Sequence, residues 1–296
     1  MKQTLKDLTR KSVFLSMMLL ACSGIFAKSK TKWAVNPELP MSVRMCQSEI
    51  IRNPEGWMLD FSTKLKWNYC HGLECQAFLD VYDRYGGDYL YKYVKQFADT
   101  MINENGRIYG YKKTNYNLDH VNSGKILFRL YEREKDPRYK IAMDTLRAQL
   151  ASQPRTSDGG FWHKKIYPYQ MWLDGIYMGS PFYAQYAATF NEPEDFADVV
   201  SQFLIIAKHT YDKKTGLYRH AWDEIKALPW SDLKTGQAPH VWGRALGWYM
   251  MAIVDALDFI PENQPGRDKM ILILNDLVKI LPKYQDQRTG AWYQVV

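Results

Sequence analysis

The feature that most constrains the fold of this chain is a regular alternation between two kinds of helix. From Met41 onward the apolar residues recur with a helical period, and helices that are apolar on most sides alternate with helices that carry one apolar stripe. Residues 248–254 belong to the first kind and should be buried on every side, whereas residues 137–152 carry a single stripe. The alternation indicates an inner ring of buried helices covered by an outer ring of amphipathic helices.

The connections between these helices also alternate, short with long. Residues 86–87 and 191–192 form short connections, and residues 103–118, 154–171 and 212–240 form long ones. The long segments and the end of the chain contain similar sequences, namely N-G-R-I-Y from Asn105, D-G-G-F-W from Asp158, K-T-G-L-Y from Lys214 and R-T-G-A-W from Arg288. The chain therefore contains an internal repeat of about 50 to 70 residues, and each repeat is one helical hairpin.

Closing such hairpins into a ring produces an all-α double toroid in which the long loops lie at one end, beside the N-termini of the inner helices. These termini carry partial positive charge and unpaired N–H groups, so this end favours an anionic ligand. A ring of six hairpins needs twelve helices, and the pattern predicts fewer. Either the ring is open or the chain is a shortened version of a longer protein. We favour the second and expect a toroid that is missing its C-terminal helices.

The start of the chain is typical of a targeting signal. Basic residues precede an apolar run at residues 13–27 that is too short for a stable membrane span. We predict a signal peptide at residues 1–27, followed by one catalytic domain at residues 33–296. A lipobox-like sequence ending at Cys22 offers an alternative cleavage site, which would attach the protein to the membrane through a lipid. The expected location is therefore the periplasm, or the bacterial envelope by a lipid anchor.

Composition excludes several classes of protein. Without the four basic residues and one acidic residue of the signal, the chain carries 35 basic and 31 acidic residues, and the basic ones are scattered. This distribution argues against a nucleic-acid partner. Three cysteines remain (Cys46, Cys70 and Cys75), an odd number that argues against a disulfide scaffold. No cysteine or histidine spacing suits a metal, and we interpret the cysteines as small buried side chains. We expect neither a metal nor an organic cofactor.

The most informative long loop is the aromatic one at residues 160–182. It contains one acidic residue, Asp174, between apolar neighbours and beside Trp172. An apolar setting raises the pKa of a carboxyl group, which can then hold a proton near neutral pH and act as a general acid. The alternative is that Asp174 only caps the N-terminus of the following helix. This stretch alone favours neither interpretation.

Similar candidates stand at the starts of the other inner helices, where the toroid would gather them around one pocket. Asp119 precedes Asp174 by one repeat, so the two carboxyls should face each other and separate in pKa into one acid and one base. Arg244 is a planar donor suited to a carboxylate ligand. The other candidates for substrate binding are Tyr69, His163, Trp172, His220, Trp242 and Trp248.

Each candidate also has a structural alternative. Asp119 is also suited to capping a helix, and Arg244 to pairing with a structural acid. Trp242 and Trp248 lie on a predicted buried helix and are also suited to the core, and His71 and His163 are as consistent with packing as with catalysis. Only the convergence of these residues at one end of the toroid favours a functional site.

Four of these segments together resemble glycoside hydrolase family 105, the unsaturated rhamnogalacturonyl hydrolases, which are related to the unsaturated glucuronyl hydrolases of family 88. The segments are F-W-H-K-K-I-Y-P-Y-Q-M-W-L-D-G-I-Y-M, N-L-D-H-V-N-S-G-K, L-Y-R-H-A-W-D-E and W-G-R-A-L-G-W. The resemblance spans residues 41–296 and implies an (α/α)6 barrel. It implies that Asp174 is the catalytic acid/base and Asp119 the second pocket aspartate. It further implies that His220, Trp242, Arg244 and Trp248 line the uronate subsite, with His163 as a pocket histidine. The family continues beyond W-Y-Q-V, where this chain ends.

The resemblance also implies a reaction. The substrate would be an acidic oligosaccharide, released by a polysaccharide lyase, with a 4,5-unsaturated uronic acid at its non-reducing end. Asp174 would protonate C4, water would add at C5, and Asp119 would orient the ring hydroxyls or the water. The alternatives are an unsaturated β-glucuronyl hydrolase for other lyase products, and a sugar-binding remnant without catalytic activity.

Overall fold

The computed structural model describes residues 35–296. The chain divides into two compact units, of which the first ends at Arg52 and the second begins at Asn53. The described part of the first unit contains α2 (Met41–Arg52), and all other elements belong to the second unit. The signal peptide and Cys22 lie outside the described residues, so export and the lipid anchor stay predictions, as does one domain from residue 33. None of the described helices has the length and apolar character that a membrane span requires.

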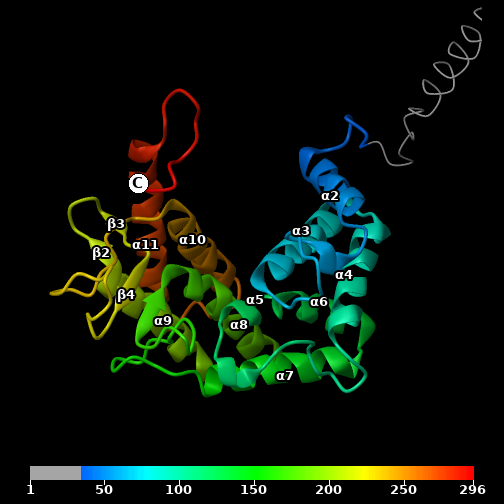
Figure 1. The fold of residues 1–296 in the computed structure, drawn as a ribbon, viewed down its shortest axis with the longest axis horizontal. Coiled ribbons are helices and arrows are strands. Elements are labelled where there is room, and N and C mark those ends of the chain that lie inside the picture. Colours follow the sequence, from blue (N-terminus) through cyan, green and yellow to red (C-terminus); the bar gives the residue numbers. More distant parts are fainter. Residues whose placement is uncertain (1–34) are drawn as a thin grey trace, which may run out of the picture. The chain divides into compact units, whose positions relative to one another are not determined.

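Within the second unit, four helical hairpins follow one another along the chain (Figure 1). They are α3 (Tyr69–Tyr85) with α4 (Asp88–Met101), α5 (Asp119–Asn122) and α6 (Lys125–Glu134) with α7 (Pro137–Ala151), α8 (Leu173–Phe190) with α9 (Asp195–Thr210), and α10 (Gly243–Leu257) with α11 (Arg267–Ile280). Short 3-10 turns lie at η1 (Gly56–Met58), η2 (Lys113–Asn115) and η3 (Leu281–Tyr284). The strands form two antiparallel pairs, β1 (Gln170–Trp172) with β4 (Ala221–Asp223) and β2 (Tyr211–Asp212) with β3 (Leu217–Tyr218).

The helices divide into an inner and an outer set. The inner helix α8 packs against α10 and α5, and α3 packs against α5 and α6, while α4, α7, α9 and α11 each pack against the inner helix of their own hairpin. Fourteen of the 18 residues of α8 are buried, as the sequence pattern predicts for an inner helix. The all-α toroid architecture is therefore confirmed.

The prediction that residues 248–254 are buried on every side is wrong. Met251 is 43% exposed and Val254 is 50% exposed, because α8 and α11 cover only part of α10 among the described residues. An apolar sequence shows that a helix has many surfaces to bury, but it does not show how many neighbours lie around it.

The internal repeat is also visible as a repeated hairpin turn. After each outer helix the chain turns back on itself in an antiparallel pairing, and each turn contains a glycine with positive φ. The pairs are Ile102–Ile108, Arg155–Phe161, Tyr211–Tyr218 and Gln285–Trp292, and the glycines are Gly106, Gly159, Gly216 and Gly290. Since L-residues rarely adopt positive φ, the glycines of the four similar loop sequences are needed to make these turns.

The inner helix of the second hairpin is interrupted at Ser123 and Gly124, between α5 and α6. The interruption lies where α3 approaches closely. The hydroxyl of Ser123 donates a hydrogen bond of 2.6 Å to the carbonyl of Asn68, and the backbone of Ser123 lies against Gly72. This tertiary contact has no signature in the local sequence.

Gly72→Ala should therefore destabilise the fold. A Cβ at Gly72 would lie 2.4 Å from the Cα of Ser123, a backbone atom that cannot move without shifting a helix. Overpacking of this kind costs about 1–3 kcal/mol, measurable by chemical denaturation. Gly247→Ala is the matched control, because nothing lies within 4 Å of its Cβ and alanine favours a helix by up to about 1 kcal/mol. Equal stabilities of the two variants would contradict the close approach of α3 and α5.

Candidate active site

Asp174 lies in the first turn of α8 and is 6% exposed. The N-cap of α8 is Trp172, which strand β1 holds against β4, so the interpretation of Asp174 as the N-cap is wrong. Burial raises the pKa of the Asp174 carboxyl, and the positive charge of Arg244 partly opposes that rise. Arg244 Nη1 lies 3.1 Å from Asp174 Oδ1, and its side chain is half exposed. The two residues form a pair in which the arginine has room to move and the acid does not.

Asp119 begins α5 and is also buried, at 7% exposure. Its carboxylate lies 2.5 Å from Lys164 Nζ and 3.4 Å from His163 Nε2. The negative charge of Asp119 contributes to the raised pKa of Asp174, so the two carboxyls interact electrostatically. Asp119 differs from Asp174 in having a closely placed lysine as its counter-ion.

His163 lies between Asp119 and the first turn of α8, which contains Asp174. Its ring stacks on Trp172 at 4.6 Å, and Trp172 stacks on Tyr167 at 5.1 Å. His163 Nδ1 has no hydrogen-bond partner and faces α8 at Gly175, where a Cβ would lie 2.7 Å away. Burial lowers the pKa of His163 to about 4, so the ring is neutral near pH 7. His163 is therefore a rigid wall of the site and cannot deliver a proton near neutrality.

His220 approaches Asp174 from the loop after β3. Its carbonyl accepts a hydrogen bond of 3.0 Å from the N–H of Leu173, which ties this loop to the start of α8. His220 Nδ1 lies 3.0 Å from the carbonyl of His240, which assigns the hydrogen to Nδ1 and leaves Nε2 as an acceptor. The ring of Trp242 lies 6.3 Å from that of His220, edge to face. His220 and Trp242 are thus fixed on one side of Asp174.

Tyr69 and Trp248 form a second aromatic group near the charged residues. Trp248 stacks on Tyr177 at 4.6 Å, and Tyr69 meets the edge of Trp248 at 6.3 Å. Burial raises the pKa of the Tyr69 phenol to about 12, with smaller effects of opposite sign from Arg244 and Asp119. Tyr69 therefore lies within the electrostatic field of both charged residues, although it comes from a different inner helix.

The nine candidates from the sequence thus lie around one location, at the N-terminal ends of α3, α5, α8 and α10. Besides His163 Nδ1, the indole N–H groups of Trp242 and Trp248 are buried without a hydrogen-bond partner in the described structure. His71 lies outside the site: it stacks on Phe97, and its Nε2 lies 3.1 Å from the carbonyl of Trp57. For His71 the packing interpretation is correct.

The chemistry available here is that of acids, bases and donors. The described residues contain no group of three histidine, cysteine or acidic side chains placed to hold a metal ion. They do bring together a carboxyl with a raised pKa, an ion-paired carboxylate, a guanidinium and two unpaired indole N–H groups. This set can bind an anion and transfer a proton to or from it.

Comparison with known proteins identifies the family. The model of Glycosyl Hydrolase Family 88 matches residues 41–296. The chain belongs to this family. Among solved structures, a family 105 glycoside hydrolase from Clostridium acetobutylicum ATCC 824 is 42% identical, with a TM-score of 0.81 over 87% of this chain and 69% of the other. A possible family 105 member from Salmonella enterica is 25% identical, with a TM-score of 0.66 over 77% of this chain and 58% of the other.

Curated proteins with similar sequences include an unsaturated rhamnogalacturonyl hydrolase and a protein without a stated activity. YesR of Bacillus subtilis, the unsaturated rhamnogalacturonyl hydrolase, is 23% identical over 80% of this family 88 chain and 66% of its own length. Protein Atu3128 of Agrobacterium fabrum is 34% identical over 119 residues, 40% of this chain. The matched region spans 50% of the length of Atu3128. The activity of the family 88 chain is therefore a matter for proposal.

The structure adds residues that sequence reasoning missed. Lys164 pairs with Asp119, Tyr177 supports Trp248, and Trp230 lies 6.4 Å from His220. No signal distinguishes Lys164 from its neighbour Lys165 in the sequence. The tight turn in which Tyr167 N–H donates to the Lys164 carbonyl at 2.9 Å helps to decide which lysine faces the acid.

Lys164→Met should destabilise this family 88 protein. The change leaves the buried carboxylate of Asp119 without its cation, at a cost of roughly 1–3 kcal/mol in unfolding free energy. Lys165→Met is the matched control, because Lys165 is exposed, and its effect should stay within about 0.5 kcal/mol. Chemical denaturation measures both. Adding Asp119→Asn to Lys164→Met should recover part of the loss, and no recovery would show that the ion pair is not the cause.

Proposed function

We propose that this protein removes the 4,5-unsaturated uronic acid from the non-reducing end of rhamnogalacturonan oligosaccharides that a lyase has released from pectin. The observation that carries the proposal is the pair formed by Asp174 and Arg244, a buried carboxyl whose pKa is raised and a half-exposed guanidinium 3.1 Å away. A buried acid that holds its proton is suited to protonating a carbon atom, and an arginine with a free face is suited to the uronate carboxylate.

The reaction we propose is hydration of the double bond. Protonated Asp174 transfers its proton to C4, and positive charge develops on C5 and the ring oxygen. Water attacks C5, and the Asp174 carboxylate accepts the proton that the water loses. The resulting hemiketal opens, and the rest of the oligosaccharide leaves from C1. One water molecule is consumed, and Asp174 ends in its starting protonation state.

The other residues support this chemistry by position. Arg244 lies at the start of α10, where the partial positive charge of the helix N-terminus adds to its attraction for a carboxylate. Trp242 and Trp248 offer buried N–H donors to the ring hydroxyls, and the ion-paired Asp119 is an acceptor for a hydroxyl or for the attacking water. His163, Trp172 and Tyr167 stack on one another and form a fixed aromatic wall beside the two acids.

A direct assay tests the proposal. Oligosaccharides from a rhamnogalacturonan lyase carry an ultraviolet chromophore at the double bond, and the protein should remove this absorbance. Unsaturated disaccharides from glycosaminoglycan lyases serve as the comparison, and faster loss with these would favour a glucuronyl hydrolase. Saturable binding with no loss of absorbance on either set would indicate a sugar-binding protein without activity and overturn the proposal.

We also propose that the protein is exported, on the basis of its basic and apolar N-terminal segment. Mass spectrometry of the mature protein from its native host distinguishes cleavage after Ala27 from lipid attachment at Cys22. An intact N-terminus in the cytoplasmic fraction would contradict export.

A further inference from the structure

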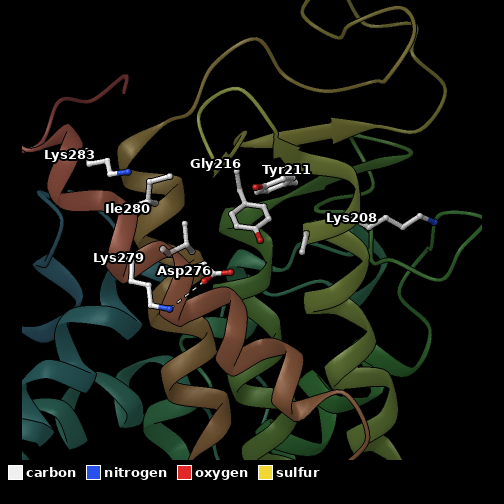
Figure 2. A pocket seen from close by; sticks show the side chains of 10 residues that line it. Lys208, Tyr211, Gly216, Asp276, Lys279, Ile280 and Lys283 are labelled. Carbon is white, nitrogen blue, oxygen red and sulfur yellow. Dashed lines mark ion pairs between the residues drawn. The ribbon is translucent and has the colours of Figure 1, made fainter.

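A cavity of about 600 Å³ lies outside the candidate active site, between α9, the β2–β3 hairpin and α11 with η3 (Figure 2). Its lining combines charged and aromatic side chains. Lys208, Lys279 and Lys283 contribute positive charge, Asp276 contributes one negative charge, and Tyr211 and Tyr218 contribute rings. We call this cavity the α9–α11 pocket.

Two of the three lysines that line the α9–α11 pocket are available to a new partner. Lys279 and Lys283 are one helical turn apart, both are exposed, and Lys283 has no ion pair in the described structure. Lys279 lies 3.8 Å from Asp276, but both side chains are more than three-quarters exposed, so water weakens that pair. The head of Lys208 points away from the cavity in Figure 2, toward solvent. The usable cations are therefore Lys279 and Lys283.

The aromatic wall of the pocket suits a ring-shaped ligand. Tyr211 is 43% exposed, and its ring packs on the buried ring of Tyr218 at a centroid distance of 5.4 Å. Tyr211 is thus held by a second ring while much of its surface stays accessible. A supported aromatic face beside cations is the kind of surface on which a sugar ring stacks.

The position of the pocket distinguishes between classes of anion. It lies at the C-terminal ends of α9 and α11, where Thr210 and Ile280 are the last helical residues. Helix C-termini carry partial negative charge and unpaired carbonyl groups, which disfavour a doubly charged phosphate. A ligand with singly charged carboxylates therefore fits this pocket better than a phosphate does.

The walls of the pocket are fixed in place. Gly216 in the turn of the β2–β3 hairpin lies so close to Ile280 that a Cβ would be 2.4 Å from the isoleucine Cδ1. The hydroxyl of Tyr284 donates a hydrogen bond of 3.0 Å to the carbonyl of Thr215 in the same turn. The hairpin is thereby tied to α11 and η3, so the cavity is a feature of the folded state and not of one side-chain arrangement.

The pocket is also connected to the candidate active site along the chain. Tyr218 lines the pocket, and His220, two residues later, faces Asp174. A sugar chain bound in the pocket therefore lies at the same end of the toroid as the reaction that we propose.

We propose that the α9–α11 pocket is a second binding site, separate from the active site, for oligosaccharides that contain several uronic acid residues. The choice of sugar rests on the proposed function, whereas the preference for a carboxylate rests on the pocket itself. Lys279 and Lys283 bind the carboxylates, and Tyr211 stacks on a sugar ring. Such a site retains long substrates and leaves the shortest ones unaffected.

Binding of saturated tetragalacturonate, measured by isothermal titration calorimetry, tests this proposal. This probe has no double bond at its non-reducing end, so it cannot be a substrate of the hydration reaction. The double variant Lys279→Glu and Lys283→Glu should bind it about tenfold more weakly than the wild type, since two favourable charge contacts become repulsive. The control Lys92→Glu and Lys269→Glu changes two exposed lysines away from the pocket, with the same change in net charge, and should bind as the wild type does.

A second variant separates sugar binding from simple charge attraction. Tyr211→Ala removes the ring and keeps the charges, so it should weaken tetragalacturonate binding several-fold and leave any binding of inorganic phosphate unchanged. Equal binding of tetragalacturonate by the wild type and all three variants would overturn the proposal, as would tighter binding of phosphate than of tetragalacturonate. Turnover of an unsaturated disaccharide should be unchanged in every variant. A failure of that assay in the wild type bears on the proposed function alone.

Discussion

Asp174→Asn is expected to lower turnover of unsaturated oligosaccharides by at least about a hundredfold, since general acid–base catalysis typically contributes ~10²–10⁴-fold. Asparagine keeps the size and shape of the side chain but can neither give a proton to C4 nor accept one from water. The site around residue 174 should otherwise persist, because β1, the N-cap at Trp172 and the packing of α8 do not depend on the carboxylate. Substrate affinity should therefore change little.

Steady-state kinetics with a lyase-generated disaccharide and calorimetry with the same compound measure the two quantities separately. Asp255→Asn is an informative control, because burial also raises the pKa of the Asp255 carboxyl. Asp255 lies on α10 and pairs with Lys125 at 3.6 Å, so it is not one of the residues of the proposed chemistry. That variant should lose stability while keeping turnover. If Asp174→Asn retained more than about a hundredth of the wild-type rate, Asp174 would not be the acid.

Much of the fold could be predicted from the sequence because the determining signals are local. Asp136 followed by Pro137 marks the start of α7, and the Asp136 side chain does accept a hydrogen bond of 2.9 Å from the N–H of Arg138. The four repeated loop sequences predict four similar turns, since each supplies a glycine where φ must be positive. The apolar neighbours of Asp174 predict its burial, because a helix that is apolar on most sides has no solvent face for it.

The remaining features depend on contacts between segments that are far apart in the chain. The break between α5 and α6 reflects the approach of Gly72 to Ser123, and the local sequence does not show which segment approaches it. The counter-ion of Asp119 is Lys164, which lies in another loop and is chosen by a turn. The individual roles of the site residues stay predictions, since position alone does not measure a rate.

The second large effect concerns Arg244, the proposed ligand of the substrate carboxylate. Arg244→Gln should raise the KM for the unsaturated disaccharide by about tenfold or more, since a charge-assisted hydrogen bond in a partly buried site contributes ~1.5–3 kcal/mol. Arg244→Lys keeps the charge and loses the planar pair of donors, so it should raise KM by a smaller factor. Steady-state kinetics measures both. An unchanged KM in both variants would assign the carboxylate to another residue.

The same arginine links substrate binding to the protonation of Asp174. The reaction needs protonated Asp174, so activity is present below the pKa of this carboxyl and is lost as the pH rises through it. Arg244 lowers that pKa in the free protein, against the larger effect of burial. Arg244→Gln removes the opposing charge and should raise the pKa of Asp174. The alkaline limb of the pH profile, where kcat/KM falls with rising pH, reports the free protein and should therefore move to higher pH. In Arg244→Lys the charge remains, and the limb should move less.

In the wild type, the substrate carboxylate should compete with Asp174 for Arg244. The guanidinium then faces two carboxylates, its attraction for Asp174 weakens, and the pKa of Asp174 rises in the complex. The alkaline limb of kcat, which reports the complex, should therefore lie at higher pH than that of kcat/KM. In Arg244→Gln there is no cation for Asp174 and the substrate carboxylate to share, so the alkaline limbs of kcat and kcat/KM should lie closer together. Limbs that coincide in the wild type would show that Arg244 stays on Asp174 throughout, and that the substrate carboxylate is bound without it.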